Sequence, residues 1–251
     1  MNSPRKIIIE ACVSSINSAI SAGRAGVDRV ELCDNINEGG TTPSAGMIKA
    51  VSELLDCKLW VLVRPRGGDF LYNDYELEVI KKDIDIVKQL NVDGIVIGIL
   101  NANGEVDKLR MKEVINHADP LKVSFHRAFD MCKNPFAAME DLIELNICRI
   151  LTSGKQNTAM EGARLIKDLI TKSNGRIEIM PGSGINIGNI EKLKELTNAT
   201  SFHLTGSYYV ESDMKYQHTD VVLNNINPSI DYNWKETSED LLKEVIRRCR
   251  Q

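Results

Sequence analysis

Eight apolar runs rich in β-forming residues alternate with amphipathic stretches along the chain, and this alternation is typical of parallel βαβ units. We expect strands at residues 7–13, 29–33, 59–64, 94–99, 122–125, 149–152, 176–180 and 201–204. Eight units in 251 residues match the usual size of a (β/α)8 barrel. The sequence therefore predicts an α/β fold, a TIM barrel that forms one domain over residues 1–251.

The segments between the strands predict helices that cover the barrel. Residues 77–90 and 187–196 each place apolar side chains at intervals of three and four, which gives one apolar stripe per helix. Asn134-Pro135 and Thr42-Pro43 each pair an N-cap residue with a proline at the first helical position, and Gly23 predicts a helix end. An amphipathic helix at about 237–250 is expected to finish the chain.

Charge and composition argue against several classes of partner. The net charge is −4, the isoelectric point is near 5.7, and Lys and Arg are scattered, so we expect neither nucleic acid nor a membrane surface as a partner. The apolar run near the N-terminus has three residues, too short for a signal peptide or a membrane span, which favours a cytoplasmic location. No nucleotide cofactor is predicted.

The six cysteines form no C-x-x-C pair and no Cys/His ligand spacing, so they are expected to be free thiols. The aromatic residues Tyr208, Tyr209, Tyr216, Tyr232 and Trp234 near the C-terminus are the one hint of a homo-oligomer.

Two strand ends repeat the same polar pattern. Glu10 and Cys12 stand two apart in the first predicted strand, and Glu31 and Cys33 stand two apart in the second. Side chains two apart on a strand share a face, and one helix separates the strands, so the strands should be parallel neighbours. Two carboxylates and two thiols are therefore expected at one end of the sheet.

Other strand ends are also polar, and in this fold the chemistry lies where the strands end. The polar ends are Arg64 and Arg66, then His126, Arg127 and Asp130, then Ser153. One reading is a structural layer of ion pairs. Because buried charges are costly and often replaceable by apolar residues, we favour a site, with Glu10, Glu31 and His126 as acid/base candidates.

Two small-residue loops follow the last two strands, at Gly182-Ser183-Gly184 and at Gly206-Ser207. Such loops commonly hold a phosphate in this fold, although they also serve simply as tight turns. His203 lies within the eighth strand, where a core histidine and a catalytic one are equally compatible with the sequence.

Six ordered motifs resemble the CutC family, the copper homeostasis proteins, over nearly the whole chain. They are Glu10-Ala11-Cys12-Val13, residues 28–33, residues 39–44, residues 64–70, residues 125–130 and Leu151-Thr152-Ser153-Gly154. The resemblance implies a cytoplasmic barrel and a role in copper tolerance with Cu(I) binding. It also implies that Cys12 and Cys33 are the copper ligands, and soft thiolates suit Cu(I).

Two hypotheses therefore stand, and whether the chain is an enzyme is open. The first is a copper homeostasis protein that binds Cu(I) through Cys12 and Cys33. The second is an enzyme that acts on a small anionic metabolite, phosphorylated or not, through Glu10, Glu31 or His126. In the second, the substrate or its anionic group would be held by Arg64, Arg66, Arg127, Asp130, Ser153, His203 and the two small-residue loops.

Overall fold

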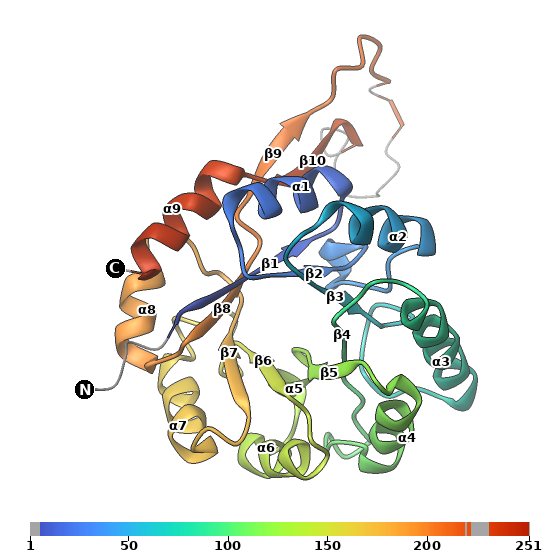
Figure 1. The fold of residues 1–251 in the computed structure, drawn as a ribbon, viewed down its shortest axis with the longest axis vertical. Helices are drawn as coiled ribbons and strands as arrows, with labels where there is room; N and C mark the ends of the chain where they lie inside the picture. The colour runs from blue at the N-terminus through green and yellow to red at the C-terminus, as the bar shows by residue number, and fades with distance from the viewer. Residues whose placement is uncertain (1–5, 219, 222–230, 251) are drawn as a thin grey trace.

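Eight parallel strands surround a common axis and confirm the predicted barrel (Figure 1). The structure, a computed structural model, describes residues 6–218, 220–221 and 231–250. The strand order is β7-β6-β5-β4-β3-β2-β1-β8, and a parallel bridge between Gly182 and His203 nearly closes the ring. The barrel strands are β1 (Ile8–Val13), β2 (Arg29–Leu32), β3 (Lys58–Leu62), β4 (Gly94–Ile97), β5 (Lys122–Phe125), β6 (Arg149–Thr152), β7 (Glu178–Pro181) and β8 (Ser201–Leu204).

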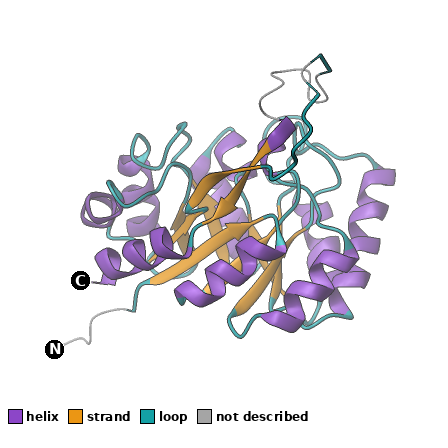
Figure 2. Ribbon diagram, turned by 90° about the horizontal axis from the view of Figure 1, so that it is seen from above, coloured by secondary structure: helices purple, strands orange, loops and turns teal. Residues whose placement is uncertain are grey.

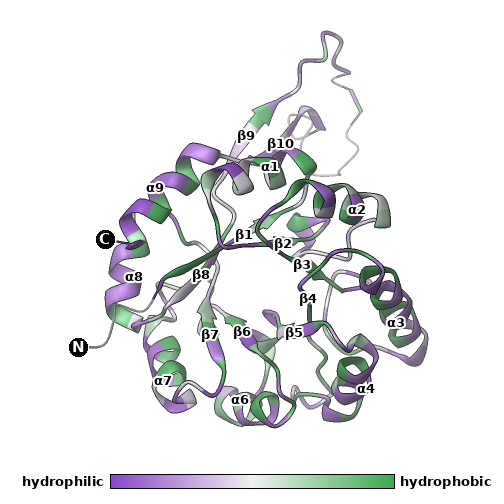
Figure 3. Cartoon of the chain, in the orientation of Figure 1, coloured by the Kyte–Doolittle hydropathy of each residue, from purple (hydrophilic) through white to green (hydrophobic). Residues whose placement is uncertain are grey.

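Helices cover the outside of the barrel and bury one apolar face each, as α3 does with Leu77, Ile80, Ile84 and Val87 (Figure 2). Hydrophobic and hydrophilic colours accordingly alternate along these helices in Figure 3. No helix in the described part of the chain is long and apolar enough to cross a membrane. The helices are α1 (Ile16–Ala25), η1 (Ile36–Glu38), α2 (Ala45–Leu54), α3 (Asp74–Lys88), α4 (Lys108–Ala118), α5 (Ala128–Met131), α6 (Pro135–Glu144), α7 (Ala163–Ser173), α8 (Ile190–Thr197) and α9 (Glu239–Arg250).

The helix ends follow the sequence signals in part. Helix α6 begins at Pro135 with Asn134 as its N-cap, as predicted, and α9 lies within the expected closing segment. The prediction from Gly23 was wrong, because α1 continues to Ala25 and Gly26 caps it with φ +80°. Gly23 serves helix packing instead, since a Cβ there would lie 3.0 Å from a side-chain carbon of Leu55.

The start predicted from Thr42-Pro43 was also wrong. Helix α2 begins at Ala45, and the Ser44 hydroxyl accepts the hydrogen bond that caps it. The Thr42 hydroxyl is engaged elsewhere, because it exchanges hydrogen bonds with the backbone N–H and carbonyl of Arg64 at 3.0 and 3.2 Å.

A β-hairpin that the sequence analysis did not predict follows β8. Its strands, β9 (Ser207–Glu211) and β10 (Asn233–Thr237), pair antiparallel and lie beside α1, outside the ring of helices (Figure 1). The Glu236 carboxylate anchors β10, because it accepts hydrogen bonds from the hydroxyls of Ser15 and Ser18, both at 2.5 Å. This long-range contact has no local sequence signal. The first five residues of the N-terminal segment considered above lie outside the described residues.

The inside of the barrel forms a core of its own, separate from the one between strands and helices. Cys12, Cys33, Trp60, Leu62 and Val96 make up its apolar part. Glycine on β4 makes room for the largest of these side chains, because a Cβ on Gly94 would lie 2.5 Å from the Trp60 ring. The lumen is thus packed around an indole that needs glycine as its neighbour.

We predict that Gly94→Ala lowers the free energy of unfolding by roughly 1–3 kcal/mol, the usual cost of overpacking a core. The new methyl group would collide with the Trp60 ring and with the Lys122 carbonyl, which would be 2.6 Å away. Urea unfolding followed by circular dichroism measures the change. Gly46→Ala is the matched control, since its Cβ would come no closer than 3.9 Å to the Ser44 hydroxyl. Equal stability of the two variants would contradict the packing argument.

Candidate functional site

A fully buried carboxylate lies at the centre of the barrel. Glu10, on β1, forms ion pairs with Arg29 of β2 at 2.9 Å and with Arg149 of β6 at 3.1 Å. Arg29 also pairs with Glu178 of β7 at 2.7 Å, and the Arg149 guanidinium lies 4.2 Å from the centre of the Trp60 ring. Two carboxylates thus face two guanidinium groups, and the four charges balance in the lower half of the lumen.

The surroundings of Glu10 determine its ionisation. Burial raises the pKa of this carboxyl, but Arg149, a hydrogen bond from His203 and Arg29 outweigh that effect and lower the pKa to about 2. Glu10 is therefore ionised at neutral pH. An acid/base role for Glu10 stays a prediction, and what the contacts show directly is that it orients His203, whose Nδ1 lies 2.9 Å from Oε1 of Glu10.

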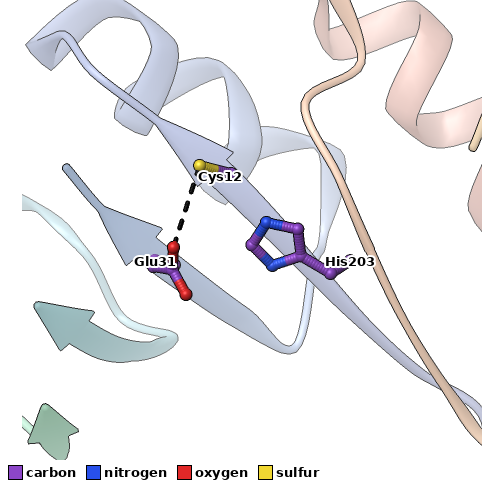
Figure 4. A group of neighbouring side chains, drawn as sticks. All are labelled: Cys12, Glu31 and His203. Carbon is purple, nitrogen blue, oxygen red and sulfur yellow. Dashed lines mark hydrogen bonds between the residues drawn. The ribbon is translucent and has the colours of Figure 1, made fainter. Parts of the chain in front are cut away.

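Cys12, Cys33, Glu31 and His203 gather above this ion pair, toward the carboxyl ends of the strands. The two sulfur atoms lie 3.7 Å apart, and the Cys12 sulfur lies 4.0 Å from Oε1 of Glu31. Figure 4 shows Cys12, Glu31 and His203 facing one another from β1, β2 and β8, and one ligand atom from each lies within 4.8 Å of the others. The geometry therefore places one thiol, one imidazole and one carboxylate within reach of a single ion.

The ionisation of these groups reflects their burial and their mutual contacts. The hydrogen bond to Cys33, followed by burial, raises the pKa of the Cys12 thiol. Burial also raises the pKa of Glu31, against the opposing effect of His203. For His203, burial lowers the pKa, but the Glu31 and Glu10 carboxyls outweigh burial and raise it above its ordinary value.

These side chains line a cavity of about 380 Å³ that opens at the carboxyl end of the barrel. Of the residues predicted from the sequence, it brings together Cys12, Cys33, Glu31, His126, Arg127, Ser183, Gly184 and His203. Arg64 and Asp130 line a neighbouring cavity of about 610 Å³, which also includes Arg127. Ser207 lines a third, of about 130 Å³, on the side of Cys12 that faces β10.

Three of the predicted anion-binding side chains make extensive contacts within the protein. The Arg64 guanidinium donates to the carbonyls of Glu38, Gly40 and Gly68 at 2.7–2.9 Å. Arg66 pairs with Glu76 and Asp69. The carboxylate of Asp130 accepts hydrogen bonds from the loop after β6 and from Arg127. Their assignment as anion ligands stays a prediction.

The remaining predicted residues lie at turns or in the loop after β6. Ser153 hydrogen-bonds Asp130 and Arg127. A Cβ on Gly182 would lie 2.5 Å from Leu151, and one on Gly206 would lie 2.7 Å from Leu242, so both glycines permit close packing. Phosphate binding by these two loops stays a prediction.

The two arginines that balance Glu10 were not predicted from the sequence. For Arg29 a signal was present, because it stands two residues before Glu31 and so shares its face of β2. Arg149 carries no such signal, since only the closed barrel places the first residue of β6 across from β1.

The chain resembles known proteins along most of its length. The model of the CutC family matches residues 7–208. A copper homeostasis protein cutC homolog from Homo sapiens is 43% identical over 230 residues, which cover 92% of this chain and 84% of that protein. A family protein CutC from Parabacteroides distasonis is 43% identical over 242 residues, which cover 96% of this chain and 100% of that one.

Solved structures agree with these relatives. A crystal structure from Streptococcus agalactiae, of a protein named for copper homeostasis and CutC, has a TM-score of 0.76 and 35% identity, covering 79% of this chain and 98% of its own. An N-(5'-phosphoribosyl)anthranilate isomerase from Pyrococcus furiosus has a TM-score of 0.58 at 10% identity, covering 97% of this chain and 98% of its own. This second likeness shows the barrel fold alone.

We predict that Glu10→Gln lowers the free energy of unfolding at pH 7 by about 3–5 kcal/mol, because it leaves Arg29 and Arg149 without their shared carboxylate. The folded pKa of Glu10 is about 2, below its ordinary value of 4.5, so the ionised group stabilises the fold above pH 4.5. This stabilisation is lost as the pH falls toward 2, and it amounts to about 3 kcal/mol.

Urea unfolding of both proteins between pH 7 and pH 2 checks this prediction. The gap between wild type and Glu10→Gln should narrow as the pH falls below 4.5. A change at the exposed Glu53, such as Glu53→Gln, should leave the profile close to wild type. Parallel wild-type and Glu10→Gln profiles over the whole range would contradict the ionisation assigned to Glu10.

Proposed function

The chain belongs to the CutC family, and from this premise we propose that it serves copper homeostasis by holding Cu(I) between Cys12 and Cys33. The observation that carries the proposal is the separation of 3.7 Å between the two sulfur atoms in the cavity at the carboxyl end of the barrel. Both residues are buried, and all six cysteines of the chain are free thiols. Thiolate sulfur is a soft ligand and suits Cu(I).

The neighbouring groups support a metal-binding role for the thiol pair. A ligating histidine usually donates its second ring N–H to a carboxylate, which fixes the orientation of the ring. His203 has this arrangement, because its Nδ1 hydrogen-bonds the ionised Glu10 and its ring stands beside Cys12 and Glu31 (Figure 4). His203 and Glu31 would thus complete or adjust the surroundings of an ion that the two sulfurs hold.

The proposed copper site requires a reducing compartment. Two thiols 3.7 Å apart are available to a soft cation only while they stay reduced, and the cytoplasm keeps thiols reduced. We therefore infer a cytoplasmic location for the working protein. The exposed Tyr208, Tyr209, Tyr216 and Trp234 on and after β9 and on β10 leave a homo-oligomer as a prediction.

We predict that Cys12→Ser and Cys33→Ser each weaken Cu(I) binding by more than about a hundredfold, because each removes one of two soft ligands. His203→Gln should have a smaller effect, about ten- to a hundredfold, which is typical of groups that orient a ligand. Competition against a Cu(I) chelator under anaerobic, reducing conditions measures these affinities.

The control for the cysteine variants is Cys57→Ser, which removes a partly buried thiol outside the cavity and should bind Cu(I) like wild type. Circular dichroism establishes that each variant is folded. Unchanged affinity in the folded double variant Cys12→Ser/Cys33→Ser would refute the assignment of copper to this pair.

A further inference from the structure

His126 is a buried donor for which the thiol pair has no use. Its Nδ1 accepts a hydrogen bond from the backbone N–H of Ala128 at 3.1 Å, so the ring proton of the neutral imidazole resides on Nε2. This Nε2 is buried and has no hydrogen-bond partner among the described residues. A buried donor without a partner costs folding free energy, so its persistence points to a ligand.

The imidazole of His126 is neutral for a physical reason. Burial, followed by the nearby Arg64 guanidinium, lowers its pKa to about 3. Glycine at the end of β4 gives the ring its place, since a Cβ on Gly98 would lie 2.6 Å from Nδ1 and Cε1. A neutral imidazole with a fixed tautomer can polarise an acceptor oxygen without itself gaining or losing a proton.

The walls around His126 suit a small organic molecule. The cavity of 380 Å³ is lined by the apolar side chains of Ile36, Leu62, Phe70, Leu151, Ile185 and Leu204. Ligand sites are usually apolar cavities of this size with a few fixed polar groups. Arg127, at the edge, lines both this cavity and its neighbour, and its charge is partly offset by Asp130 at 2.8 Å.

Phe70 stands between the two cavities, because its side chain lines both. The Phe70 ring packs against the imidazole of His126 with the ring centroids 4.9 Å apart. The Arg64 guanidinium lies 5.0 Å from the centroid of the Phe70 ring. Three backbone carbonyls hold the Arg64 guanidinium in place, so the surface that the Phe70 ring contacts is fixed. Displacing Phe70 would uncover the imidazole and join the cavities.

We propose that this cavity binds a small organic molecule through a carbonyl or carboxylate oxygen that accepts a hydrogen bond from Nε2 of His126, with Phe70 moving aside to admit it. The oxygen accepts the hydrogen bond for which Nε2 of His126 has no partner among the described residues. The apolar walls enclose the carbon skeleton. The site is separate in chemistry from the thiol pair, since an acceptor oxygen needs a hydrogen-bond donor, whereas the thiol pair offers soft ligands to a metal ion. It does not depend on copper binding.

The test uses the full-length, reduced, metal-free wild-type protein with its histidine side chains labelled with 15N. Three probes are titrated: acetate, which has only a carboxylate; acetone, which has only a carbonyl; and pyruvate, which has both. We expect at least one probe to shift the Nε2–H resonance of His126 at millimolar concentration. A shift with acetate or with acetone identifies which of the two oxygens the site takes, and a shift with pyruvate alone shows that it takes a molecule that bears both.

Variants then assign the contact. His126→Phe keeps a ring but removes the donor, and it should weaken binding of the active probe about tenfold, the equivalent of one hydrogen bond. His126→Gln, which restores an N–H at similar reach, should recover part of that loss. Phe70→Ala should strengthen binding, and His117→Phe, on α4 outside the barrel, should leave it unchanged.

Two results would overturn the proposal. One is the absence of any shift of the wild-type Nε2–H resonance with all three probes at 100 millimolar. The other is equal affinity in wild type and folded His126→Phe. Because copper is absent throughout, neither result bears on the role of the cysteines, and loss of Cu(I) binding in the cysteine variants does not bear on His126.

Discussion

The balance of charge around Glu10 is the constraint on which the rest of the lumen depends. A carboxylate without solvent exposure is tolerated only when partners compensate it, and here β2 and β6 supply the two guanidinium groups while β8 supplies the imidazole. The three contacts come from three different strands, so the network also fixes how those strands sit around β1. The hydrogen bond to Glu10 orients the His203 ring, and it thereby sets how the ring faces Cys12 and Glu31.

The cavity at the carboxyl end of the barrel combines two kinds of polar group, metal ligands and a hydrogen-bond donor. The sulfurs of Cys12 and Cys33 are soft metal ligands, whereas the N–H of His126 is a hydrogen-bond donor for an oxygen atom. The proposed copper site uses the sulfurs and leaves the N–H of His126 without an assigned task. A site in which a soft cation and an oxygen-bearing molecule occupy adjoining regions would account for both, and it would make each ligand a neighbour of the other.

The sequence predicted what depends on local pattern. The strands were found because each is an apolar run between turn signals, and Cys12, Glu31 and Cys33 came together because alternation along a strand is strictly local. The β9–β10 hairpin and Arg149 were missed because their partners lie far away in the chain. The contacts of Arg64 show the same limit, since a residue at a strand end reads alike whether it faces a ligand or loop carbonyls.

The anchoring of Glu236 to Ser15 and Ser18 has a consequence for how the protein is made. Cys12 on β1 is synthesised well before its neighbour His203 on β8, and β10, which lines the other side of Cys12, follows later still. The two thiols therefore lack the residues of β8 and β10 that enclose them until these later segments have been synthesised. The enclosed cavity can therefore form only after β8 and β10 have been made, although its thiols come from the first two strands of the barrel.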